Sequence, residues 1–122
     1  MEAKETIYRS KVRRIMGPMN GLLTLGFGSA AIFSGLDQQY ILSVSEAVTA
    51  LGFGYEMYNN IRYGTRDGRG YIAAALGSMS TVLNSPYTEG FNFHGVVGNV
   101  GIPFSVINGF ATLGHKLNRR DR

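Results

Sequence analysis

The sequence contains no cysteine and no tryptophan, and only three of its 122 residues are proline. The absence of cysteine excludes disulfide bonds, thiolate zinc sites and thiol catalysis. The two histidines, His94 and His115, have no second histidine or acidic residue at ligand spacing, so we expect no metal site. No arrangement of Ser, His and Asp predicts a nucleophile, and the glycine-rich runs lack the Lys-Ser or Lys-Thr of a phosphate loop. We therefore expect no catalytic residues, no cofactor and no enzyme activity.

Charge is also scarce, at 16% of residues, and it is unevenly spread. All twelve Lys and Arg residues lie in three clusters, at residues 4–14, 62–69 and 116–122. If the chain crosses a bilayer four times, all three clusters lie on one side. The two short connections around Asp37 and Glu89 lie on the other and contain no basic residue. This asymmetry is the one that the positive-inside rule describes, and it places both termini on the same side.

The segments between the clusters predict an all-α fold, an integral membrane bundle of four transmembrane helices in two hairpins. The expected helices cover about residues 15–36, 39–61, 70–84 and 95–114. They form a transmembrane domain over residues 15–115, between a basic N-terminal tail at 1–14 and a basic C-terminal tail at 116–122. The mean hydropathy is close to zero, which is low for such a protein. Gly, Ser, Thr, Asn and Tyr within the uncharged segments lower it.

Small residues recur at helical spacing in all four segments, which predicts close helix crossings rather than a pore lining. The candidate packing residues are Gly17, Gly21, Gly26, Ala50, Gly54, Ala73, Gly77, Gly101, Ser105 and Gly109.

Two carboxylates and one amide are the candidate polar residues at membrane depth. A charge there costs at least ~2.5 kcal/mol, so it should be paired, protonated or facing water. Glu56 is close enough to Arg62 to reach the basic interface, whereas Glu46 has no partner nearby in the sequence and is the better candidate for a contact inside the bundle. Asn99 lies in the fourth segment, where Pro103 predicts a kink or local unwinding.

The loop before the third segment resembles the signature of the preprotein and amino acid transporter superfamily, which includes import channels of the mitochondrial inner membrane. That signature is a basic residue, an Asp and then a pair of small residues. Arg62 or Arg66, then Asp67, then Ala74 with Ala75 match these roles. The chain is most similar to the four-helix accessory subunits of mitochondrial respiratory complex I. The resemblance implies a multi-pass protein of the mitochondrial inner membrane.

Two classes of function remain open from the sequence. The first is a non-catalytic structural accessory subunit of a respiratory complex, whose partners are other membrane subunits and whose basic clusters meet anionic phospholipid headgroups. The second is a small four-helix transporter or translocation-channel subunit, with Glu46 and Asn99 along the path. Lipid headgroups or a partner subunit explain the basic C-terminus more simply than nucleic acid does.

Overall fold

The computed structural model describes residues 2–85 and 93–120, and every regular element in those ranges is a helix. The elements are α1 (Glu2–Lys11), a π-helical turn (Val12–Met16), α2 (Gly17–Leu36), α3 (Tyr40–Tyr63), α4 (Arg69–Asn84) and α5 (Phe93–Arg120).

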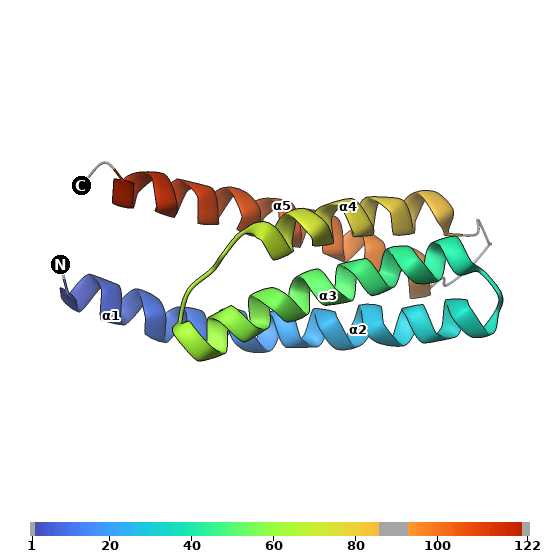
Figure 1. The fold of residues 1–122 in the computed structure, drawn as a ribbon, viewed down its shortest axis with the longest axis horizontal. Coiled ribbons are helices and arrows are strands. Elements are labelled where there is room, and N and C mark those ends of the chain that lie inside the picture. Colours follow the sequence, from blue (N-terminus) through green and yellow to red (C-terminus); the bar gives the residue numbers. More distant parts are fainter. Residues whose placement is uncertain (1, 86–92, 121–122) are drawn as a thin grey trace.

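The helices form an up-and-down bundle (Figure 1). α2 packs on α3, α3 on α4 and α4 on α5, and fewer contacts between α2 and α5 close the bundle. The two chain ends and the connection from α3 to α4 lie at one end, and the turn from α2 to α3 lies at the other. The sequence-based prediction of an all-helical four-helix bundle is therefore confirmed.

The predicted N-terminal tail is helical instead. α1 and the π-helical turn lead into α2 without a break, since Lys11 and Gly17 both have right-handed helical backbone angles. The Gly17 N–H bonds to the carbonyl of Val12, five residues back, and this widened turn comes just before Pro18, which cannot donate a backbone hydrogen bond. At the other terminus, residues 116–120 belong to α5 rather than to a tail.

Pro103 does not unwind the fourth helix, because α5 continues through it from Phe93 to Arg120. The hydroxyl of Ser105 donates to the carbonyls of Gly101 and Ile102, at 2.6 and 3.1 Å. These two bonds connect the residues just before Pro103 with the turn that follows it.

Glycine ends α3 and positions α1 beside it. Gly64 has φ +67°, a left-handed conformation that caps the helix, and its N–H donates to Asn60 at 3.0 Å. A Cβ at Gly64 would lie 2.8 Å from Cβ of Arg9. The same glycine therefore allows both the turn and the close approach of α1.

The backbones of α3 and α4 touch where they cross. A Cβ added to Gly52 would lie 2.5 Å from the carbonyl oxygen of Gly70 and 2.9 Å from the backbone nitrogen of Ala74. Further along, a Cβ on Gly77 would lie 2.9 Å from the carbonyl oxygen of Ser45. Only glycine fits at these positions without a shift of backbone.

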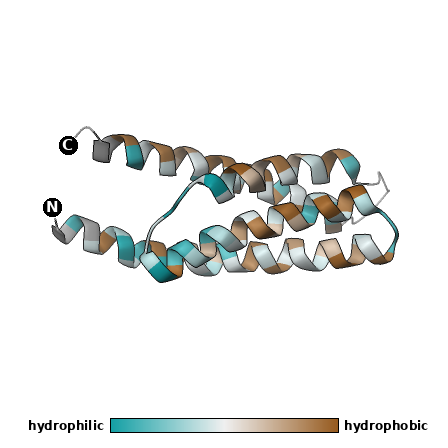
Figure 2. Cartoon of the chain, viewed as in Figure 1, coloured by the Kyte–Doolittle hydropathy of each residue, from teal (hydrophilic) through white to brown (hydrophobic). Residues whose placement is uncertain are grey.

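The interior of the bundle is more polar than its surface. Phe27, Phe53, Tyr71 and Ala74 form a small apolar core, in which the rings of Phe27 and Phe53 are 5.9 Å apart. Among the described residues, however, twelve polar or charged residues are buried against seven hydrophobic ones. Large apolar side chains cover the outside, where Leu51 is 73% and Leu83 is 83% exposed. Figure 2 shows hydrophilic residues gathered in α1, in the α3–α4 connection and in the α2–α3 turn.

Two of the described helical stretches, Thr6–Leu36 and Phe93–Leu117, are long and apolar enough to cross a membrane, judged by length and composition. Only 22% of the apolar window in each stretch is buried in the bundle. Both windows thus present most of their residues outward.

Candidate functional site

Glu46 lies at the centre of a polar cluster between three helices. Its side chain, on α3, is completely buried. Its Oε1 accepts a short hydrogen bond from the hydroxyl of Ser34 on α2. Its Oε2 lies 2.7 Å from Nδ1 of His94, in the first turn of α5. The partner that the sequence could not identify for Glu46 is therefore 48 residues away along the chain.

The geometry of this cluster differs from that of a catalytic triad. In a triad one imidazole nitrogen bonds the carboxylate and the other bonds the serine. Here Nδ1 of His94 is close to both Glu46 and Ser34, at 2.7 and 3.3 Å, and the Ser34 hydroxyl donates to the carboxylate. The carboxylate of Glu46 is therefore bonded from two sides, and these contacts link α2, α3 and α5.

Glu56 caps the start of α4 from the neighbouring helix. Its Oε1 accepts hydrogen bonds from the backbone N–H groups of Asp67 and Gly68, at 2.9 and 2.7 Å. The first N–H groups of a helix have no partner within it, and a carboxylate there also matches the helix dipole. Glu56 thus reaches the connection at residues 62–69 that carries the basic cluster, but it does so as a completely buried side chain bonded to backbone N–H groups.

The loop residues of the family-like signature have separate roles. Asp67 accepts from the hydroxyl of Tyr55 at 3.0 Å and pairs with Arg69 at 3.2 Å. Arg62 is exposed, and its guanidinium lies 5.7 Å from the centre of the Tyr63 ring. Ala74 is buried against α3 in the apolar core, whereas Ala75 is half-buried beside a groove between α4 and α5.

Arg66, unlike Arg62, points into the structure. Its Nε donates to the hydroxyl of Tyr8 at 3.1 Å, and its Nη1 donates to Asn108 at 3.3 Å. The Tyr8 ring in turn stacks on His115, with centroids 4.1 Å apart. One loop arginine thus connects α1 with α5 at the basic end of the bundle.

A third buried cluster was not predicted from the sequence. The amide of Asn20 on α2 donates to Asn60 on α3 at 2.6 Å and to the Tyr71 hydroxyl on α4 at 2.9 Å. All three side chains are almost completely buried. The sequence did contain a signal for this cluster, because Asn20 and Asn60 each lie in a segment with few charges. A buried amide needs hydrogen-bond partners, so the two could have been expected to pair.

Asn99 does not join these clusters. It is exposed on α5, and its amide donates to the carbonyl of Gly95, one turn earlier, at 2.7 Å. The expectation that it shares an interior path with Glu46 is wrong, because it faces outward.

Most of the candidate packing residues lie against neighbouring helices. A Cβ on Gly17 would meet Ile61, one on Gly21 would meet Met57, and one on Gly101 would meet Phe27. Gly77 and Ser105 are buried, and the remaining candidates are half-buried: Gly26, Ala50, Gly54, Ala73 and Gly109.

Together these features define a four-helix bundle with an apolar exterior and a polar interior in which Glu46, Glu56 and Asn20 are hydrogen-bonded to neighbouring helices or loops. Among the described residues, no three His, Asp or Glu side chains gather where they could hold one metal ion. Comparisons with protein-family models, curated proteins and solved structures found no match.

Proposed function

We propose that the chain is an integral membrane protein whose four helices all cross the bilayer. The main support is the distribution of polar and apolar side chains, which is the opposite of that in a soluble protein. Glu46, Glu56 and Asn20 are buried, and large aliphatic residues are exposed. In water this arrangement would leave the large apolar side chains exposed to solvent. In a bilayer the same side chains contact lipid, and the polar groups contact one another inside the bundle. Leu22, at 72% exposed, is typical of the lipid-facing residues.

The tyrosines of α3 support this placement. Tyr40 is exposed at one end of α3, and Tyr58 is exposed near the other. Their separation of eighteen positions along the helix corresponds to a rise of about 27 Å. This is close to the ~30 Å thickness of a hydrocarbon core, at whose borders tyrosine is enriched. The apolar surface of α3 lies between these two levels, where Leu51 is an example.

Within the membrane, the proposed role is that of a non-catalytic structural accessory subunit. The buried glutamates support it, because Glu46 and Glu56 are bonded by groups of this same chain. The resemblance of the 62–75 region to the import-channel superfamily directs the proposal to the mitochondrial inner membrane and to complex I. In that role the exposed apolar faces pack against neighbouring subunits, and the basic end meets headgroups or partners.

Two measurements test this function in sequence. Alkaline carbonate extraction of native membranes should leave the chain in the pellet, and its release would refute the membrane placement. Solubilisation in mild detergent should then show the chain in a particle far larger than itself, with other subunits. A small free homo-oligomer that carries ion or solute flux after reconstitution would contradict the subunit role.

A second function, proton-coupled transport, is favoured by one observation: the Glu46–His94 contact joins two groups that can exchange a proton in the interior. Glu46→Gln separates the two functions. We expect weakened assembly if the contact is structural, and lost flux with intact assembly if it is a transport site. Asp37→Asn, the same change of charge in the exposed α2–α3 turn, is the matched control.

A further inference from the structure

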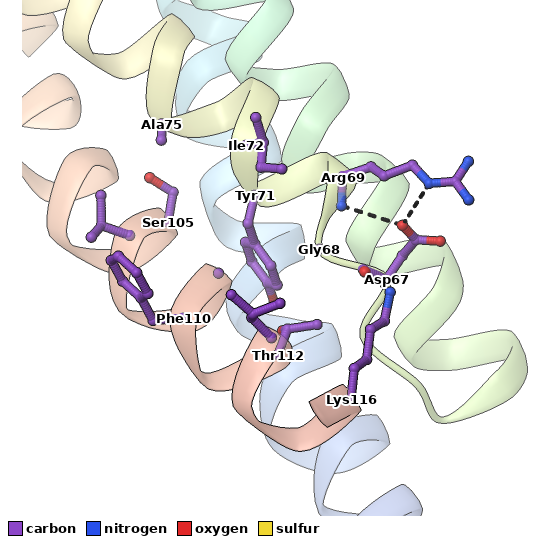
Figure 3. Close-up of a pocket in the computed structure, with 13 residues that line it drawn as sticks. Asp67, Gly68, Arg69, Tyr71, Ile72, Ala75, Ser105, Phe110, Thr112 and Lys116 are labelled. Atoms are coloured by element: carbon purple, nitrogen blue, oxygen red, sulfur yellow. Dashed lines mark hydrogen bonds and ion pairs between the residues drawn. The ribbon is translucent and has the colours of Figure 1, made fainter. Parts of the chain in front are cut away.

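A groove of about 420 Å³ lies between α4 and α5 near the basic end of the bundle (Figure 3). Its volume falls in the range of about 300–1,000 Å³ that is typical of ligand sites. Ile72, Phe110 and Leu113 form its sides and are themselves 63%, 71% and 52% exposed. Ala75 and Gly109 also line the groove, and because they are small they leave the space between the larger side chains open.

One end of the groove is charged. Figure 3 places Arg69, Asp67 and Lys116 together there, whereas Ala75 and Ser105 lie at the other end. The side chain of Arg69 is 84% exposed and pairs with Asp67 at 3.2 Å. Lys116 is also exposed, and its ammonium donates to the backbone carbonyl of Asp67. Two exposed cations thus lie at this end of the groove, beside the carboxylate of Asp67. The carboxylate of Glu56, which bonds the Gly68 N–H, is completely buried behind them, so an anion in the groove meets the two cations at the surface.

The length of the groove corresponds to half a bilayer. From Ser105 to Lys116 the helix advances by eleven residues, a rise of about 17 Å. One leaflet contributes about half of the ~30 Å hydrocarbon core. With Lys116 at the level of the headgroups, Ser105 lies close to the middle of the membrane.

We propose that this groove binds one anionic phospholipid from the leaflet on the basic side. Its phosphate lies between Arg69 and Lys116, and one acyl chain follows the wall of Ile72, Phe110 and Leu113. A single phospholipid satisfies both parts of the site, because it combines an anionic head with an apolar chain of leaflet length. The inference rests on the membrane placement proposed above.

The test is native mass spectrometry of the full chain, released from nanodiscs of equal parts phosphatidylglycerol and phosphatidylcholine. The unmodified chain should retain one phosphatidylglycerol. Gly109→Leu and Ala75→Leu fill the groove and should abolish retention. Lys116→Gln should lower the preference for phosphatidylglycerol about fivefold, the effect of one basic residue near the surface. Gly114→Leu is the matched control on α5, because a Cβ there meets nothing within 4 Å.

Three results would overturn the assignment. The first is an unmodified chain that retains no lipid although it resists carbonate extraction, which would leave the membrane placement intact. The second is equal retention by Gly109→Leu and Gly114→Leu, both with helical circular dichroism spectra. The third is a stable dimer that Gly109→Leu disperses, since the groove would then hold a second copy. Lys116→Gln alters only an exposed side chain, so it tests the headgroup contact even if both filling variants misfold.

Discussion

Oε2 of Glu46 lies 2.7 Å from Nδ1 of His94, and this contact joins the first turn of α5 to α3 near the α2–α3 turn of the bundle. The carboxylate is completely buried and also bonds Ser34 of α2. The side chain of Glu46 therefore links three helices, α2, α3 and α5.

Removing this carboxylate should destabilise the bundle strongly. We expect Glu46→Ala to lower the free energy of unfolding by about 1–3 kcal/mol for each of the two hydrogen bonds that lose their buried acceptor, those to Ser34 and His94. Denaturant unfolding in detergent micelles measures the change. Asp37→Asn, in the exposed turn, should stay within about 0.5 kcal/mol of the unmodified chain, and a similar loss in both variants would contradict the prediction.

Glu56 should protect the start of α4. Glu56→Ala removes the acceptor of the partly buried Asp67 and Gly68 N–H groups, at an expected cost of about 0.5–1.5 kcal/mol for each hydrogen bond lost. Hydrogen exchange at these two amides should accelerate, while exchange in the middle of α2 stays slow. Glu56→Gln keeps one oxygen acceptor, so its effect should be smaller than that of alanine; equal effects would show that the hydrogen bonds do not matter.

The α3–α4 crossing should reject even one methyl group. At Gly52 a Cβ would lie 2.5 Å from the backbone oxygen of Gly70, so Gly52→Ala must separate the helices. The expected cost is about 1–3 kcal/mol, typical of overpacking. At Gly28 a Cβ meets nothing within 4 Å, and Gly28→Ala should be neutral or stabilise by up to about 1 kcal/mol. Thermal unfolding of the two variants side by side measures both, and the opposite order would refute the close approach.

The Tyr71 hydroxyl should contribute to stability through its hydrogen bond with Asn20. Tyr71→Phe retains the ring in the core but removes the acceptor at 2.9 Å from the Asn20 amide, so we expect a loss of about 0.5–1.5 kcal/mol. Tyr58→Phe is the control, because that side chain is 54% exposed. Equal stability of the two variants would count against the Asn20–Asn60–Tyr71 cluster.

The fold was largely predictable because its signals are local. Long uncharged segments separated by basic clusters predicted the bundle and the common side of the termini, and helix ends near Leu36 and Asn84 agree with α2 and α4. The helical state of residues 2–14 was missed, because a basic composition is equally compatible with a solvated tail and a solvated helix. The π-helical turn before Pro18 joins this stretch to α2 without a break.

The candidate polar residues show the limits of the same approach. Glu46 was identified because a charge is rare in such a segment, and Asn99 because it is a polar residue close to the expected kink at Pro103. The sequence does not show which side of its helix a residue occupies, and Glu46 is buried on α3 whereas Asn99 is exposed on α5.

By itself the sequence determined the number of helices, their order and the end at which the basic clusters meet, because these follow from composition along the chain. Only the tertiary structure decided which polar groups are partners. Glu46 and His94, or Asn20 and Tyr71, are separated by 48 and 51 residues. Their contacts depend on the rotation of each helix about its axis, and that rotation is set by the glycine crossing of α3 and α4 and by the packing around Phe53.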